Sequence, residues 1–182
     1  MRNVMAAGFV ILLSLPLGAR ADESMTPLAE SGDWVALAHR EDLSSPPDFC
    51  VAMNAVEHFM LRSDQNDLEV RYSDHSWSLP ADVIGDLKLA INGTSYVLPI
   101  TANTNITVSA TVSQDQLEQI VEDMNKATSI SVTAGSARAA QISLTGSNPV
   151  VTAFLTCAGI NQPGNTGGAN PFQSQPPSNP AQ

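Results

Sequence analysis

The sequence predicts an α+β domain in which a β-rich antiparallel sheet or sandwich carries two amphipathic helices and one disulfide. Three observations lead to this prediction. Short apolar segments with a two-residue period fill most of residues 33–160, the apolar spacing becomes helical in only two segments, and the two cysteines lie near opposite ends of that region. Strands, one helix, further strands and a last helix follow in order, which disfavours a doubly wound α/β fold with alternating strands and helices.

The first part of the domain is predicted to contain strands. Six short segments are rich in apolar residues or alternate apolar with polar residues, as half-buried strands do: 34–39, 49–53, 67–72, 87–91, 96–100 and 106–112. Asn92-Gly93 separates two of them. This dipeptide predicts a two-residue hairpin, because both central residues of a type I′ turn need positive φ.

A helix is predicted next. Ser113 and Gln116 have the spacing of a capping box, which marks a helix start. The apolar residues that follow are spaced i, i+3, i+4 and i+7, the pattern of one buried stripe: Leu117, Ile120, Val121 and Met124. Glu122 and Lys126 form a favourable i, i+4 pair near the end.

The last part of the domain is predicted to hold a pair of strands and a second helix. The strands, 130–132 and 140–144, can pair across the turn between them. The helix is expected to begin with Asn148 as cap and Pro149 in the first position, and to end at Gly159. Its apolar stripe consists of Val151, Phe154, Leu155 and Ala158.

The N-terminus has the features of a cleavable signal peptide over residues 1–21. Arg2 precedes an apolar run, Val4–Leu17, which is shorter than the roughly 20 residues of a spanning helix. Small residues in Ala19-Arg20-Ala21 predict cleavage near Ala21/Asp22. The alternative is an uncleaved N-terminal anchor.

Composition divides the remaining chain into three parts. Residues 22–32 are polar and are expected to form a short flexible leader, and 33–160 are long enough for a single globular domain. Residues 161–182 are rich in Pro, Gly, Asn and Gln, and Phe172 is their single large apolar side chain. We expect this tail to be disordered, because it cannot bury enough apolar surface to offset the cost of ordering.

The two cysteines, Cys50 and Cys157, are predicted to form a disulfide. An exported chain folds where disulfides persist, in the periplasm or outside the cell. The bond would close a loop of 107 positions, for which the chain-entropy model gives about 4.7 kcal/mol. The alternative, a nucleophilic or metal-binding thiol, is disfavoured because neither cysteine lies in a CxxC pair or beside a histidine.

Charge and hydropathy restrict the partners. The chain has a formal net charge of −10, and cleavage after residue 21 would remove two of its 8 basic residues and none of its 18 acidic ones, which leaves −12. Such a surface repels phosphate backbones and anionic lipid headgroups, so we expect no nucleic-acid binding. No second long apolar stretch follows, so we expect no membrane insertion of the mature chain.

No motif predicts catalysis or a cofactor. The metal-ligand candidates are His39, His58 and His75, the last two beside acidic residues, but no HExxH or HxH spacing is present and a zinc site needs three or four converging ligands. No Gly-x-Ser-x-Gly elbow occurs. The sequence therefore predicts no catalytic residue, no metal and no cofactor.

Four aromatic residues are candidates for binding a sugar or a peptide: Trp34, Tyr72, Trp77 and Tyr96. Aromatic side chains in strands also pack in cores and at sheet edges. The sequence favours this packing and leaves the binding surface open.

Several short motifs occur in a fixed order: Gly32-Asp33-Trp34, Cys50, Trp77-Ser78-Leu79-Pro80, and Ile142–Ser147 leading into a helix that ends at Cys157. In this order the chain resembles small periplasmic proteins of alphaproteobacteria, the invasion-associated locus B family, over most of residues 32–158. The resemblance implies a non-catalytic, β-rich envelope or virulence-associated module with no active site to transfer.

The leading functional prediction is an exported, non-catalytic binding or interaction module of the bacterial envelope, with a protein partner in the envelope or extracellular space. Two alternatives remain. One is a small exported hydrolase or metal-binding protein that uses His58 or His75 with neighbouring acids, and the other is an inhibitor or immunity-type protein.

Overall fold

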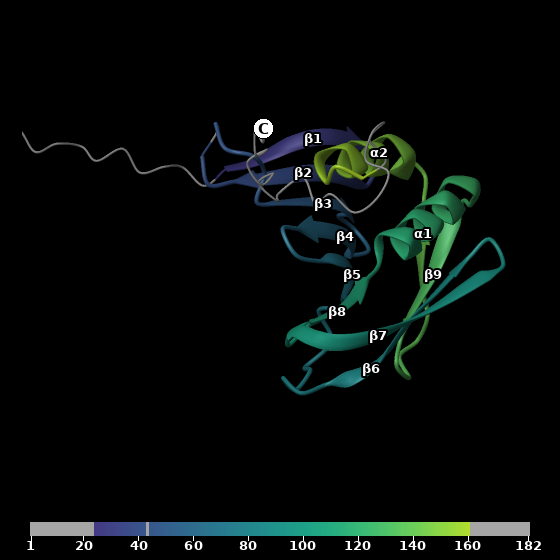
Figure 1. Cartoon of the computed structure of the whole chain (residues 1–182). Helices are drawn as coiled ribbons and strands as arrows, with labels where there is room; N and C mark the ends of the chain where they lie inside the picture. The colour runs from purple at the N-terminus through teal and green to yellow at the C-terminus, as the bar shows by residue number, and fades with distance from the viewer. Residues whose placement is uncertain (1–23, 43, 161–182) are drawn as a thin grey trace, which may run out of the picture.

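The computed structural model describes residues 24–42 and 44–160, which form ten strands and two helices (Figure 1). The strands are β1 (Ser24–Ser31), β2 (Trp34–Arg40), β3 (Phe49–Asn54), β4 (Phe59–Asp64), β5 (Leu68–Ser73), β6 (Ile84–Ile91), β7 (Thr94–Thr104), β8 (Thr107–Val112), β9 (Ser129–Ala134) and β10 (Ala140–Ser143). The helices are α1 (Gln114–Lys126) and α2 (Ser147–Cys157). The predicted signal peptide and tail lie outside the described residues.

All ten strands belong to one antiparallel sheet, in the order β1-β2-β3-β4-β5-β8-β7-β6-β9-β10. The predicted antiparallel class is confirmed, with a single sheet where the sequence left a sandwich open. Figure 1 shows the strands curling around α1 and α2. Helix α2 contacts β1, β2 and β3, while α1 contacts α2 and β6.

Alternation along the strands determines which side chains face the helices. On β6, Leu87, Leu89 and Ile91 are fully buried, whereas Lys88 and Ala90 between them are exposed. The same period on the other strands supplies the rest of one continuous core. The sheet therefore has a buried concave face and a partly solvated convex face.

The predicted hairpin is confirmed. Ile91 of β6 pairs with Thr94 of β7, so Asn92 and Gly93 form a two-residue turn, with φ of 48° and 85°. Glycine adopts this left-handed conformation without the cost that a Cβ imposes.

Helix α1 agrees with its prediction. The Ser113 hydroxyl accepts a hydrogen bond from the Gln116 backbone N–H at 3.2 Å, and Lys126 pairs with Glu122 at 2.6 Å. The predicted stripe is the buried face: Leu117, Ile120, Val121 and Met124.

Helix α2 is confirmed, but its start and part of its stripe differ from the prediction, since Val150 is buried and Leu155 is only half-buried. Gly146, with φ of 87°, occupies the N-cap position in place of Asn148 and makes no side-chain cap. The buried Ser147 hydroxyl donates to the Leu144 carbonyl at 2.9 Å. This hydroxyl is therefore paired within the turn. The turn between β10 and α2 also lies against the backbone of Ser31, so a residue larger than glycine at position 146 would clash with it. The predicted stop is confirmed, since Gly159 has φ of 68°.

The predicted flexible leader, residues 22–32, differs from the structure, because Ser24–Ser31 form β1. This segment lacks an apolar alternation, but its backbone pairs with β2 along most of its length. β1 is an edge strand, and its register shifts between Pro27 and Ala29, as a proline at an edge permits. Strand β4 was also not expected from the sequence, and it is held by pairing with β3 on one side and β5 on the other.

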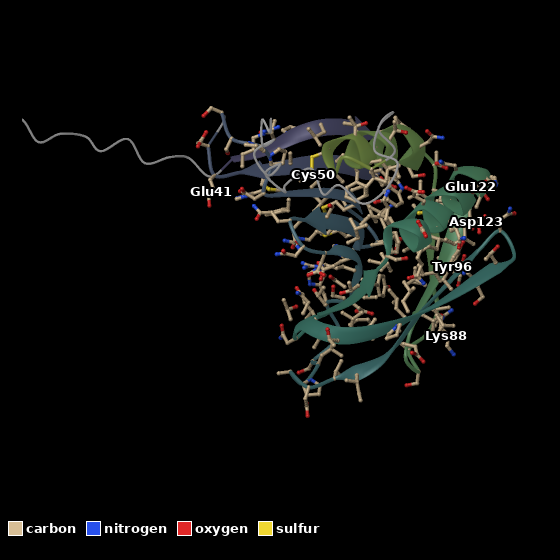
Figure 2. All side chains as sticks on the ribbon, viewed as in Figure 1. Glu41, Cys50, Lys88, Tyr96, Glu122 and Asp123 are labelled. Carbon is tan, nitrogen blue, oxygen red and sulfur yellow. A yellow bond between two sulfur atoms is a disulfide. The ribbon has the colours of Figure 1, made fainter. Side chains whose placement is uncertain are left out.

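Two long-range links join the first part of the domain to the last. The predicted disulfide is confirmed: Cys50 of β3 bonds to Cys157 of α2, with Cα atoms 6.1 Å apart (Figure 2). The buried Trp34 indole N–H of β2 donates to the Ser143 carbonyl of β10 at 2.8 Å. The first and last parts of the domain are thus fastened to each other.

Candidate functional site: an apolar cavity at one end of the sheet

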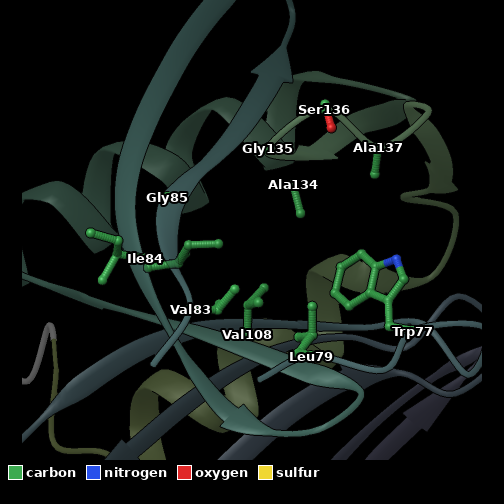
Figure 3. A pocket seen from close by; sticks show the side chains of 11 residues that line it. Trp77, Leu79, Val83, Ile84, Gly85, Val108, Ala134, Gly135, Ser136 and Ala137 are labelled. Atoms are coloured by element: carbon green, nitrogen blue, oxygen red, sulfur yellow. The ribbon is translucent and has the colours of Figure 1, made fainter. Parts of the chain in front are cut away.

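A cavity of about 320 Å³ opens between the starts of β6 and β8, the end of β9 and the β5–β6 connection (Figure 3). We call it the Trp77 cavity, after its largest lining side chain. Leu79 and Val83 of the β5–β6 connection, Ile100 of β7 and Val108 of β8 also contribute to its wall. It extends the apolar concave face towards solvent.

The cavity exists because small residues occupy two inward-facing positions. Along β6 the inward residues are Gly85 and then the larger Leu87, and along β9 the last inward residue is Ala134. Leu87 pairs with Ala134, so the two small residues lie near each other at the same end of the sheet. A Cβ at Gly85 would approach Ile100 no closer than 4.0 Å, so the space beside it is open.

Trp77 is held against this opening by its neighbours. Its backbone N–H donates to the Asp74 carbonyl at 3.1 Å, and its ring meets Tyr72 edge-on, with centroids 5.6 Å apart. In Figure 3 the six-membered ring faces the cavity and the nitrogen lies on the far side. The Trp77 wall is therefore hydrocarbon.

The lining of the cavity carries no charge. Ser136, in the β9–β10 turn, has the only side-chain hydroxyl among the lining residues. Ile84, at the start of β6, is 85% exposed. The nearest charged residues along the chain flank the lining on both sides: Asp82 and Asp86 beside β6, and the exposed Arg138 in the β9–β10 turn. The arrangement can take up an apolar group and offers no ion pair to a charged one.

The other three aromatic candidates do not line the cavity. Trp34 packs in the core against Phe59, and Tyr72 is also buried. The Tyr96 hydroxyl donates to Asp123 of α1 at 2.7 Å (Figure 2). Burial of Tyr96, together with this carboxylate, raises the pKa of its phenol to about 12. Three of the four candidates thus have packing roles, although Trp34 also touches a smaller pocket of about 230 Å³, and Trp77 is the candidate that lines the Trp77 cavity.

The structure brings two of the three candidate histidines together. The His58 and His75 rings meet edge-on, with centroids 4.7 Å apart. His39 lies elsewhere: its Nδ1 is 2.9 Å from an Asp48 oxygen and its ring stacks on Phe49. Over residues 24–42 and 44–160, no group of three or more His, Cys, Asp or Glu side chains could hold a metal ion.

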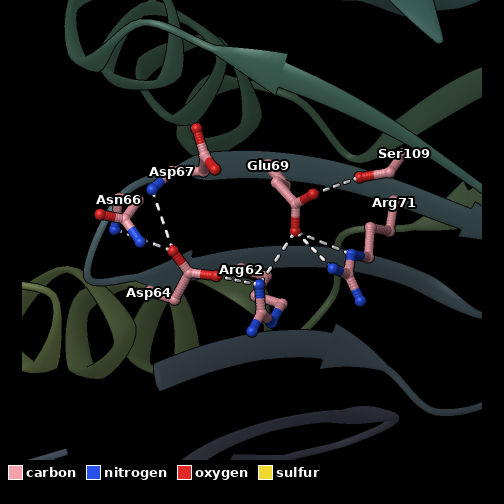
Figure 4. A network of polar contacts seen from close by, with 7 residues as sticks. All are labelled: Arg62, Asp64, Asn66, Asp67, Glu69, Arg71 and Ser109. Atoms are coloured by element: carbon pink, nitrogen blue, oxygen red, sulfur yellow. Dashed lines mark hydrogen bonds and ion pairs between the residues drawn. The ribbon is translucent and has the colours of Figure 1, made fainter. Parts of the chain in front are cut away.

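A polar network on the convex face was not found from the sequence (Figure 4). The Glu69 carboxylate of β5 accepts hydrogen bonds from Arg62 at 3.1 Å, from Arg71 at 2.5 Å and from the Ser109 hydroxyl at 2.7 Å. Burial acts to raise the pKa of Glu69, but the Ser109 hydroxyl and the two guanidinium groups outweigh it and lower that pKa below its ordinary 4.5. The residues come from three adjacent strands, so only the strand order reveals the network.

We expect Glu69→Gln to make the free energy of unfolding depend less on pH in the acid range. Because the folded-state pKa of Glu69 is lowered, its contribution is present above pH 4.5 and is lost as pH falls through the folded-state value. In urea unfolding at pH 7 the variant should lose about 1 to 2 kcal/mol, and the gap from wild type should close in acid. Glu30→Gln, on the exposed edge strand, is the control. A constant gap at every pH would contradict this assignment.

Together the fold and the cavity define the class of the protein: a disulfide-bonded α+β domain whose single curved antiparallel sheet packs against two helices and leaves an apolar cavity at one end. In the part of the chain that the structure describes, no helix is long and apolar enough to cross a membrane. Comparison with family models, curated proteins and solved structures finds no match to this chain.

Proposed function

We propose that this protein is an exported binding module, periplasmic or secreted, which receives an apolar group of its ligand in the Trp77 cavity. The cavity is the observation that carries the proposal. Protein interiors are packed as densely as organic crystals, and pockets of about 300 Å³ or more with apolar walls are the usual form of a ligand site. The lining described above has that size and chemistry.

The exposed apolar surface beside the cavity adds a second argument. Ile84 exposes 85% of its surface at a place where the lining is already apolar. A single exposed apolar residue is ordinary, but one that continues an open apolar cavity enlarges the surface that a ligand can cover.

Export is supported by the N-terminal segment and by the disulfide, because such bonds persist in oxidising compartments. The resemblance to the invasion-associated locus B family points in the same direction and towards an envelope or extracellular partner. Signal-peptide cleavage near Ala21/Asp22 belongs to this proposal. Mass spectrometry of protein recovered from outside the cytoplasm should find a mature N-terminus near Asp22 and no free thiol, and two free thiols would contradict export in the folded form.

The alternative hydrolase or metal-binding function rests on the contact between His58 and His75. Two imidazoles fall short of the three or four ligands that a zinc site uses. The cavity has the larger set of observations behind it, and we therefore favour binding.

Filling the cavity tests the proposed function. Gly85 has no positive φ and faces the open space, so Gly85→Phe should place a ring in the cavity without straining the backbone. Ala90→Phe adds the same ring to an exposed position of the same strand. In native mass spectrometry of exported protein, a bound component, protein or small molecule, should accompany wild type and Ala90→Phe and be absent from Gly85→Phe. Equal recovery from all three, including none from any, would contradict the proposal.

A further inference from the structure

We infer that the ligand of the Trp77 cavity is an uncharged small molecule whose bound part is a two-ring, mainly hydrocarbon group. This inference rests on the proposed function and adds the chemical class of the ligand. Three properties of the cavity lead to it: its volume, the absence of charge in its lining, and the small apolar surface exposed around its mouth.

The volume sets the size of the group. A dry apolar cavity of about 150 Å³ in another protein binds benzene. The Trp77 cavity, at about 320 Å³, has roughly twice that space. Its walls are aliphatic on the side of Val83, Ile100 and Val108, and aromatic on the side of Trp77. A fused or linked pair of rings fills this volume and can pack against the hydrocarbon edge of the indole.

The lining excludes a charged group. A charge that enters an apolar site without a partner loses its hydration, and this cost is large. No lining side chain is charged, and the single hydroxyl among them, that of Ser136, can donate one hydrogen bond and accept two. Asp82 and Asp86 flank lining residues on one side and the exposed Arg138 flanks Ala137 on the other, so the neighbouring charges favour neither sign, while the net charge of −10 disfavours an anion at longer range. The bound group is therefore neutral, with room for a hydroxyl beside Ser136.

The surroundings of the mouth favour a small molecule over a side chain of a protein partner. A stable protein interface buries about 800 Å² on each partner and has an apolar centre around its anchors. Among the described residues, the exposed large hydrophobic side chains other than Ile84 do not line this cavity: Met25, Leu28, Val56 and Val97. Within the described part of the chain, Ile84 is thus the single large apolar side chain exposed at this opening, which is less than the apolar centre of a protein interface and suits a small molecule that enters the cavity.

A matched pair of dyes tests the charge and the size. N-phenyl-1-naphthylamine and 1-anilinonaphthalene-8-sulfonate have the same naphthyl and phenyl rings, and only the second carries a sulfonate. In fluorescence titrations of the exported, disulfide-bonded protein, we expect the neutral dye to bind at least about tenfold more tightly than the anionic one. N-acetyltryptophanamide, which displays a tryptophan side chain on a peptide backbone, should compete at least about tenfold more weakly than naphthalene.

Two cavity-filling variants locate the binding. Gly85→Phe and Ala134→Leu fill the space from β6 and from β9. Each should lower the affinity for the neutral dye by about tenfold or more, while Ala90→Phe should bind the dye as the wild type does. Circular dichroism and thermal unfolding establish that each variant is folded. If only one of the two filling variants folds, that variant decides the test.

The outcomes separate this inference from the proposed function. Equal affinity for the two dyes, both lost on filling the cavity, would overturn the uncharged ligand and leave the binding module intact. Stronger competition by N-acetyltryptophanamide than by naphthalene would replace the small molecule with a partner's side chain. Dye binding that survives both filling variants would overturn the site, and the proposed function with it.

Discussion

Removing the disulfide with the double substitution Cys50→Ala and Cys157→Ala is expected to lower the free energy of unfolding by about 3 to 5 kcal/mol. The bond joins residues 107 positions apart, so its loss frees a long loop in the unfolded chain. In the folded state it also fastens α2 to β3, at the side of the sheet that carries the edge strand β1. Urea or thermal unfolding of the purified domain measures the change.

Reduction of the wild type provides the control for this experiment. Dithiothreitol should destabilise the wild-type protein to the level of the double variant and leave the double variant unchanged, because the variant has no bond to lose. Residue 50 is fully buried, and alanine leaves little empty space there. A reduced wild type as stable as the oxidised one would show that the bond does not stabilise this fold.

Gly146→Ala is expected to destabilise the domain by about 3 kcal/mol. A Cβ at position 146 would lie 2.4 Å from the Ser31 carbonyl oxygen, and φ is 87°. Two costs therefore add: the left-handed backbone, and the displacement of the β1–β2 turn by a backbone clash that no rotamer change can relieve. Thermal unfolding should show the loss, and hydrogen exchange should show faster opening of β1.

Gly93→Ala separates the two costs. Gly93 has nearly the same φ, 85°, but a Cβ there would have no neighbour within 4 Å. Its substitution should cost only the backbone term, about 1 kcal/mol. Equal losses at the two positions would mean that the close approach of the two turns does not matter, which would contradict the interpretation of Gly146.

Features that depend on neighbours in the sequence were predicted correctly. The Asn92-Gly93 turn, the Ser113 cap and the apolar stripe of α1 each result from interactions within a few residues. The disulfide was also predictable, because the two cysteines leave a single intramolecular pairing. β1 was not, since its side chains show no alternation and its strand conformation comes from pairing with β2.

The candidate site was only partly predictable. Trp77 was named among four aromatic residues, and it lies outside the predicted strands whereas the buried Trp34 begins one, but this difference does not reveal a cavity beside Trp77. Gly85 and Ala134 were missed. The sequence does show that the inward-facing residue at one end of β6 and of β9 is small. This predicts a cavity only when it is known that β6 pairs with β9.

By itself the sequence determined the antiparallel class, most of the strands and both helices, because periodicity, turn residues and caps act over a few positions. Only the tertiary structure decided the strand order, in which the pairings of β5 with β8 and of β6 with β9 join segments distant in the chain. Those pairings place Glu69 beside Ser109 and leave the Trp77 cavity open. The physical reason is that the backbone hydrogen bonds of one antiparallel pair differ little from those of another. The choice of partner strand therefore depends on how the buried faces pack in the folded domain.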